Sequence, residues 1–339
     1  MGWDLITVSA LLLAIGLISY VVLDGVSLGS GIMLPTLRKA SAKTTFARSF
    51  APVHLSNGLW LLMCALGLMI AFPAAFQVLL EALTIPISVM LVAWLVRVWS
   101  GQKLLRTSAE QGSSYYALFS ISALVIALSQ GMMLGAVIQG MTLEGTQFVG
   151  GVWDWLTWFS GLTGITVVLT YALLGVTWSL FAVPDTNLRA TLRAYSRHVL
   201  VWCGYALMAL QLIMPFLTDA LRERWLTLPN FFHMGFVPML ALMAYVWVYY
   251  VIRFSEWKVW PFGIVLQVVG TAYFTLVTSL WPALVPPSLT LADAAAASSS
   301  LSLMLWSAVI IVPALIAFSL WRHLGFYRPN AGAKYAYVS

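Results

Sequence analysis

The chain has 339 residues, of which 61% are hydrophobic and only 8% are charged. A soluble domain carries about 25% charged residues, so this composition excludes a soluble enzyme or a separate soluble domain. The net charge of +6 does not indicate nucleic-acid binding, because the basic residues lie between apolar segments and form no patch interleaved with exposed aromatic side chains. Cys64 and Cys203 both lie inside apolar runs, which argues against a disulfide framework.

The apolar segments have the length of membrane-crossing helices. Such a helix needs about 20 mostly apolar residues, and by this rule the sequence predicts about nine spans. They lie near residues 4–23, 52–72, 79–98, 115–138, 157–182, 199–217, 232–252, 260–281 and 302–322. No basic residue precedes the first apolar run, so we expect the first span to be retained and not cleaved as a signal peptide.

We expect these spans to form a single membrane domain over residues 1–339, with an all-α polytopic fold. The first four spans, within residues 1–140, are expected to form one four-helix bundle. The next four, within residues 150–283, are expected to form a second bundle. The last span, at 301–323, would then be a peripheral helix, and a short tail would follow at 324–339.

Basic residues are distributed unevenly between the two sides of the predicted bundles. Nearly all of the 17 lie in the loops after spans one, three, five and seven and in the C-terminal tail, with Arg97 expected in the loop after the third span. The exceptions are Arg222 and Arg224, and most acidic residues fall on their side. Because cytoplasmic loops carry the excess of Lys and Arg, we predict that the N-terminus lies outside and the C-terminus in the cytoplasm.

Two connections between spans have an unusual composition. Residues 218–228 mix charged and apolar side chains, which predicts a short amphipathic helix along the outer surface. Residues 281–301 contain three prolines followed by an Ala/Ser tract. This second segment is a poor candidate for a span, so we expect a short re-entrant or interfacial piece there.

Asp24 is the strongest single candidate for a functional residue, because it is a carboxylate at the end of the first predicted span. An aspartate at the centre of a membrane helix costs about 2.5–3.5 kcal/mol on insertion scales, so it usually faces a bundle interior or a wet cavity and can relay protons. The other interpretation is an ion pair at the helix end with Arg48 or Lys39. The position of Asp24 alone favours neither interpretation.

A second polar group lies in the stretch Ser49–Trp60, at the start of the second span. His54, Ser56 and Asn57 stand at the mouth of this helix, and Trp60 follows one turn further in. Polar side chains at this depth indicate a functional surface when they face protein or water. On spacing alone, however, hydrogen bonding at the level of the lipid headgroups is the favoured interpretation.

Small residues one turn apart indicate close helix packing. Gly25 and Gly29 form one such step, and Gly131 and Gly135 form another. Without a hydrophobic drive in lipid, helices associate where small residues let the backbones approach. The four histidines do not pair at ligand spacing, so we predict no metal site, although haem ligation by histidines on facing helices stays open.

Several motifs together resemble subunit II of cytochrome bd-type quinol oxidases. The segment Leu23–Gly31 resembles the D-G-F-D-x-G-x-G segment of that family, and Ser49–Trp60 resembles its S-x-A-P-x-W-D-G-N-x-x-W segment. Further matches follow in the same order along the chain, at residues 71–75, 130–140, 171–175 and 288–294. The resemblance therefore covers nearly the whole chain.

This resemblance implies a bacterial cytoplasmic (inner) membrane protein that pairs with a homologous subunit I. In that family, subunit I carries haem b and haem d, or a second b-type haem, and oxidises quinol, and O2 is reduced to water with protons drawn from the cytoplasm. Subunit II carries no haem or other metal, supports subunit I and contributes to proton or oxygen access. The resemblance also leaves room for small single-helix subunits and for a structural quinone or lipid.

The chain departs from the family pattern at two acids. Ser27 stands where the second aspartate of the first motif is usual, and Leu55 where the aspartate of the second motif is usual. We therefore expect a proton path that is weakened, rerouted or rebuilt around Asp24, His54, Ser56 and Asn57. Trp60 is the candidate for oxygen access or partner packing. The alternatives are a polytopic transporter and a non-catalytic assembly paralogue.

Overall fold

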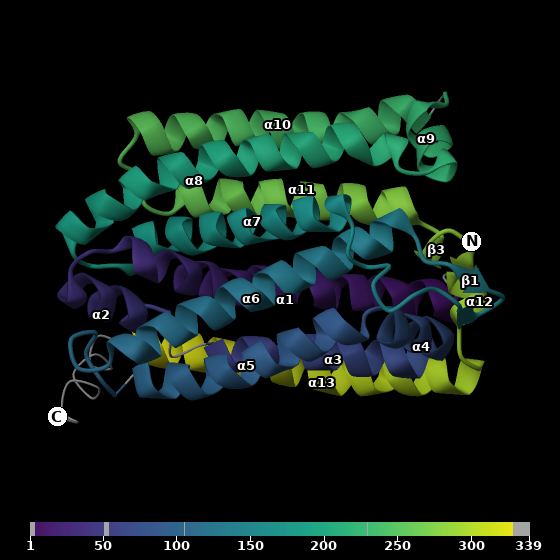
Figure 1. Ribbon diagram of the computed structural model, residues 1–339, viewed down its shortest axis with the longest axis horizontal. Coiled ribbons are helices and arrows are strands. Elements are labelled where there is room, and N and C mark those ends of the chain that lie inside the picture. Colours follow the sequence, from purple (N-terminus) through teal and green to yellow (C-terminus); the bar gives the residue numbers. More distant parts are fainter. Residues whose placement is uncertain (1–3, 51–53, 105, 229, 328–339) are drawn as a thin grey trace.

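The computed structural model describes residues 4–50, 54–104, 106–228 and 230–327 (Figure 1). For residues 54–56, 233 and 322–327 the structure describes the backbone and not the side chains. The helices of the protein run nearly parallel to one another, and the connecting segments lie at the two ends of the bundle (Figure 1).

Most of the described chain is helical. The helices are α1 (Leu5–Met33), α2 (Ala40–Arg48), α3 (His54–Ala71), α4 (Pro73–Ala82), α5 (Thr84–Leu104), α6 (Ser113–Gln139), α7 (Trp158–Ala182), α8 (Thr186–Ile213), α9 (Asp219–Leu226), α10 (Asn230–Phe254), α11 (Trp260–Leu280), α12 (Leu291–Ala294) and α13 (Ser298–Tyr327). Short 3-10 turns extend α1 at Leu34–Thr36 and α8 at Met214–Phe216.

The lengths of these helices confirm the all-α polytopic membrane fold. In the described part of the chain, eight helices are long and apolar enough to cross a membrane, namely α1, α5, α6, α7, α8, α10, α11 and α13. The shorter apolar helix α3 coincides with the second predicted span. The amphipathic helix predicted at residues 218–228 is also confirmed, as α9.

The third predicted span, 79–98, is wrong in its bounds. One helix, α4, ends at Ala82, and α5 begins at Thr84 and continues to Leu104. Pro86 explains the break, because a proline inside a helix lacks an N–H and its ring clashes with the carbonyl group four residues earlier, here that of Ala82. The shift places Arg97 inside α5, and not in a loop as the sequence predicted.

Two small hairpins were not predicted. Strands β1 (Leu143–Glu144) and β2 (Gln147–Phe148) pair antiparallel, and Gly145 between them has a φ of +63°. Strands β3 (Ala283–Val285) and β4 (Leu289–Thr290) form the second hairpin, directly before the one-turn helix α12. Both hairpins lie at the same end of the bundle (Figure 1).

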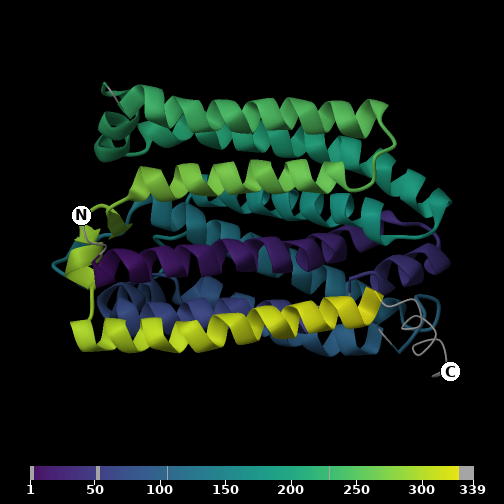
Figure 2. The same cartoon turned by 180° about the vertical axis from the view of Figure 1, so that it is seen from behind.

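The centre of the molecule is built on α1 and α7. Helix α1 packs against α3, α6 and α7, and α7 packs in turn against α6, α8 and α11. Helices α8 and α10 form one edge of the molecule, and α13 lies along α3 at the opposite edge (Figure 2). The contacts of α7 with α1 and α6 join the two halves of the chain, and the division into bundles at 1–140 and 150–283 stays a prediction.

Glycines lie at the closest of these helix crossings. A Cβ atom on Gly29 would lie 1.6 Å from the backbone oxygen of Tyr171, and one on Gly25 would lie 2.9 Å from the Tyr171 ring. At the crossing of α6 and α7, Cβ atoms on Gly131 and Gly135 would each lie 2.6 Å from a backbone Cα of α7. Larger side chains therefore cannot be accommodated at Gly29, Gly131 or Gly135 without moving a backbone.

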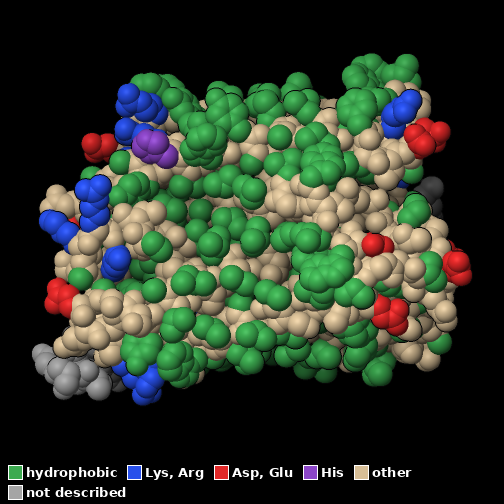
Figure 3. Space-filling model, viewed as in Figure 1, with side chains coloured by type: hydrophobic (Ala, Val, Ile, Leu, Met, Phe, Trp, Pro, Cys, Tyr) green, Lys and Arg blue, Asp and Glu red, His purple; other side chains and the backbone are tan. Residues whose placement is uncertain are grey.

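Charged side chains gather at the two ends of the bundle. Lys and Arg dominate the end with α2 and the α10–α11 turn, and Asp and Glu dominate the end with α9 and β1 (Figure 3). On the face that Figure 3 shows, the region between the two ends carries apolar side chains and almost no charged ones, as a lipid-facing surface requires. The orientation of the chain in the membrane stays a prediction.

Candidate functional site

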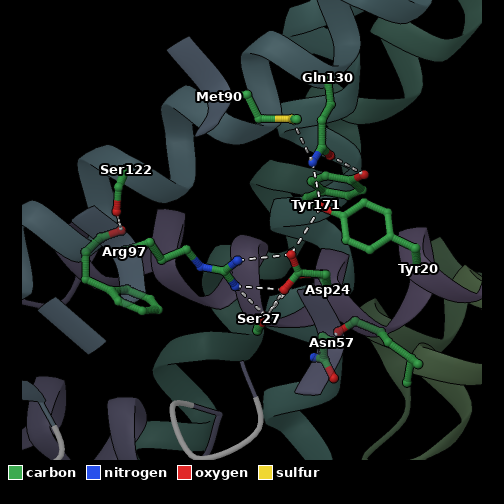
Figure 4. A network of polar contacts seen from close by, with 11 residues as sticks. Tyr20, Asp24, Ser27, Asn57, Met90, Arg97, Ser122, Gln130 and Tyr171 are labelled. Atoms are coloured by element: carbon green, nitrogen blue, oxygen red, sulfur yellow. Dashed lines mark hydrogen bonds and ion pairs between the residues drawn. The ribbon is translucent and has the colours of Figure 1, made fainter. Parts of the chain in front are cut away.

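The site is centred on an ion pair between Asp24 of α1 and Arg97 of α5. The two side chains are 0% and 1% exposed. Two parallel hydrogen bonds join them, from Arg97 Nη1 to Asp24 Oδ2 at 3.0 Å and from Nη2 to Oδ1 at 2.8 Å (Figure 4). Of the two interpretations of Asp24, the ion pair with Arg48 or Lys39 is wrong in its partner, because the partner is Arg97, which lies inside the bundle on α5.

Ser27 forms hydrogen bonds with both members of the ion pair. It lies three residues after Asp24, so both side chains share one face of α1. The Ser27 hydroxyl donates to Asp24 Oδ1 at 2.7 Å and accepts from Arg97 Nη2 at 2.6 Å. The guanidinium also lies over the ring of Phe119, with its Cζ 5.6 Å from the ring centroid. These contacts fix the planar guanidinium on several sides, although its Nε is buried without a hydrogen-bond partner.

A chain of hydrogen bonds extends from Asp24 across the bundle (Figure 4). Tyr20, one turn before Asp24, donates its hydroxyl to Asp24 Oδ2 at 3.2 Å. Gln130 of α6 donates from Nε2 to the Tyr20 hydroxyl at 2.5 Å and accepts from the Tyr171 hydroxyl of α7 at 2.9 Å. The network thus joins α1, α5, α6 and α7.

The direction of these hydrogen bonds determines what the network can do. Tyr171 donates toward Gln130, Gln130 toward Tyr20, and Tyr20 toward Asp24, so every donor in the chain points to the carboxylate. Charge-assisted hydrogen bonds of this kind stabilise an ionised group. With one acid and one base, the cluster of Asp24, Arg97 and Ser27 is neutral as a whole.

Of the other predicted residues, Asn57 lies beside this cluster. Asn57 of α3 is 1% exposed and donates from Nδ2 to the backbone oxygen of Leu23 at 2.8 Å, next to Asp24 in the chain. His54 and Ser56 fall in the first turn of α3, but their side chains lie outside the described residues. Trp60 is 5% exposed, and its Nε1 donates to Ser319 Oγ of α13 at 3.3 Å.

Several members of the network could not be predicted from the sequence. Nothing in the sequence marks Tyr20, Tyr171 or Gln130 as members of a network with Asp24. One signal was available for Arg97, because an arginine within an otherwise apolar segment needs a buried counter-charge. Among the described residues, no group of three or more His, Cys, Asp or Glu side chains lies close enough together to hold a metal ion.

The fold and the site define a polytopic all-α membrane protein whose central helices are joined through a buried ion pair. The family model for cytochrome bd terminal oxidase subunit II matches residues 5–326. The chain belongs to this family, and it is thus a subunit of a bd-type terminal oxidase, an oxidoreductase complex of the bacterial cytoplasmic membrane. The complex implies a partner subunit I.

A solved structure supports the same fold. One chain of the bd oxidase from Geobacillus thermodenitrificans superimposes with a TM-score of 0.75 and 17% sequence identity, covering 96% of this chain and 99% of that chain. At this identity, the similarity shows the fold alone. No curated protein sequence matches the chain.

Proposed function

We propose that the chain is the non-haem subunit II of a quinol oxidase that reduces O2 to water. The haem-bearing subunit I would hold haem b and haem d, or a second b-type haem, and would oxidise the quinol. The observation that carries this proposal is the match of the subunit II family over residues 5–326. It favours an oxidase subunit over the transporter, whereas a non-catalytic assembly paralogue stays an outcome of the experiment.

The experiment is a reduced-minus-oxidised visible spectrum of the complex purified through a tag on this chain. Haem bands together with a second large subunit would support the proposal. Haem bands with this chain alone would contradict the assignment of the haems to subunit I. A chain that purifies with neither haem nor partner would favour the assembly paralogue. The same preparation would reveal small single-helix subunits and a bound structural quinone or lipid.

We further propose that the Asp24 cluster is the contribution of this chain to proton access. Asp24 is a buried carboxylate with the hydroxyl groups of Tyr20 and Ser27 within hydrogen-bond distance. His54, Ser56 and Asn57 would form the entrance, at the start of α3. This assignment agrees with a cytoplasmic position for the basic end of the bundle, which a reporter fused to the C-terminus would test.

A second candidate role for the cluster is mechanical. The bidentate pair with Arg97 favours a fixed charge that anchors α1 to α5, because all donors point to the carboxylate. Under this alternative, protons would reach the oxygen-reducing site through subunit I, and Asp24 would keep the helices in register.

Charge-neutral variants of the purified complex separate these two roles. Asp24→Asn alone removes the acid and leaves Arg97 buried without a counter-charge, so it would lower activity under either role. The double variant with Asp24→Asn and Arg97→Gln removes both charges and keeps polar groups in place. If Asp24 carries protons, quinol oxidation and proton uptake stay slow in the double variant. If Asp24 is only an anchor, the double variant recovers near wild-type turnover.

A further inference from the structure

An apolar groove lies between α10 and α11. It encloses about 580 Å³ and is lined by Phe232, Met234, Phe236, Val237, Phe274 and Thr278. This volume is within the range of about 300–1,000 Å³ that is typical of small-molecule sites. The lining is almost entirely apolar, which suits a hydrocarbon chain and offers no hydrogen-bonding set for a polar ring.

Helix α9 is held beside one end of this groove. Trp225 of α9 is buried, and its Nε1 donates to Ser279 Oγ of α11 at 3.1 Å. Ser279 follows Thr278, which lines the groove, and α9 also packs against α10. The residue before Trp225 is Arg224, so α9 brings the backbone of a basic residue to the same corner of the molecule as the groove.

Arg224 has no carboxylate partner among the described residues. The described part of the chain holds two ion pairs, Arg97 with Asp24 and Arg222 with Asp219, and neither includes Arg224. The Nε of Arg224 is buried without a hydrogen-bond partner. Burial lowers the pKa of the Arg224 guanidinium, but an arginine stays protonated at any physiological pH. This cation therefore lacks an anionic partner within the described part of the chain.

The charge around α9 restricts the kind of anion. Helix α9 lies at the end of the bundle where Asp and Glu dominate (Figure 3), and Asp219 and Glu223 lie on α9 itself beside the two arginines. A free anion in solution is repelled by this surface. An anion attached to a hydrocarbon chain is held at the corner by apolar contacts and reaches Arg224 from the membrane side.

We propose that the α10–α11 groove and Arg224 together bind one anionic phospholipid. An acyl chain occupies the groove between Phe236 and Phe274, and the phosphate group lies against the guanidinium of Arg224. A quinone fits the groove less well, because its head carries no charge to pair with Arg224. A zwitterionic lipid is bound more weakly, because its ammonium group cancels the charge of its phosphate.

The experiment compares two photoactivatable lipids in the purified complex. Phosphatidylglycerol or phosphatidylcholine, each with a diazirine in the same acyl chain, is added as a minor component to phosphatidylcholine vesicles that contain the complex. After irradiation, mass spectrometry of peptides measures the labelling of residues 230–240 and 270–280. We expect phosphatidylglycerol to label them about five-fold more than phosphatidylcholine, as for one cationic side chain beside an anionic lipid.

Arg222 provides a matched control on the same helix. It is two residues from Arg224, so it lies on the opposite flank of α9, and it is exposed and paired with Asp219. We expect Arg224→Gln to reduce phosphatidylglycerol labelling to the phosphatidylcholine level and Arg222→Gln to preserve the five-fold preference. Val237→Trp, which fills the groove, should reduce the labelling by both lipids.

Three results would overturn the proposal. Equal labelling by the two lipids in the wild-type complex would show that the groove accepts any acyl chain. Equal loss in Arg222→Gln and Arg224→Gln would show a general effect of charge. A quinone or a polypeptide recovered from the groove would show another occupant. If Arg224→Gln fails to fold, competition by unlabelled phosphatidylglycerol against unlabelled phosphatidylcholine in the wild type decides the same question.

Discussion

Replacing Arg97 with glutamine would leave the carboxylate of Asp24 without its counter-charge inside the bundle. Arg97 makes two hydrogen bonds to Asp24 and one to Ser27, and both members of the ion pair are almost completely buried. Removing one partner of such a pair costs about 3–5 kcal/mol, because an uncompensated charge stays buried. We expect the unfolding temperature of the complex to fall by roughly 5–10 °C.

The double variant with Asp24→Asn and Arg97→Gln tests the reason for this loss. Removing both charges together is often neutral, because neither charge then has to be taken out of water. We therefore expect the double variant to unfold within about 2 °C of the wild-type complex. Differential scanning fluorimetry of the purified complex measures both variants. A double variant that is as unstable as Arg97→Gln would refute the electrostatic reasoning and would indicate a purely steric role for the two side chains.

Three further predictions concern neighbouring residues. Gly29→Ala should prevent correct packing of α1 on α7 and lower the free energy of unfolding by about 3 kcal/mol. Gly161→Ala of α7 is the control, because a Cβ there meets nothing within 4 Å, and it should leave the yield and the unfolding temperature unchanged. Ser27→Asp should place a second carboxylate opposite the single guanidinium of Arg97, and the unfolding temperature of the complex should fall below that of the wild type because one buried negative charge lacks a partner. Trp60→Phe should lower the free energy of unfolding by about 1 kcal/mol, because the hydrogen bond to Ser319 is lost, and Trp60→Ala should lower it by about 3–5 kcal/mol. If the oxygen affinity of the complex is unchanged in both variants, the role of Trp60 is limited to packing.

The fold could be predicted from the sequence because a membrane requires long apolar helices. The apolar runs located every major helix, and the charged and apolar mixture at 218–228 located α9. The hairpins at residues 143–148 and 283–290 could not be predicted, since strands of two or three residues leave no periodic pattern. The break between α4 and α5 at Leu83 was not predicted, although Pro86 indicates a helix break at this point.

The site could be predicted only in part. Asp24 was identified because a carboxylate in a span requires an explanation. Its partner Arg97 could not be identified, because Asp24 and Arg97 are 73 residues apart in the sequence. They meet only through the packing of α5 against α1, whose register the sequence does not reveal. A rule based on loops and helix ends therefore pointed to Arg48 and Lys39. The same limit applies to Tyr171 and Gln130, which meet only because α6 and α7 cross closely at Gly131 and Gly135.

The serine at position 27 is best understood from the charge of its surroundings. The family motif places a second aspartate here, and two aspartates facing one arginine would leave a net negative charge in the bundle. With Ser27, a single acid faces Arg97, and the hydroxyl satisfies one oxygen of the acid and one nitrogen of the base. A serine in place of the second aspartate therefore leaves one carboxyl group at this position. The departure therefore bears directly on whether α1 carries protons or only holds α5 in place.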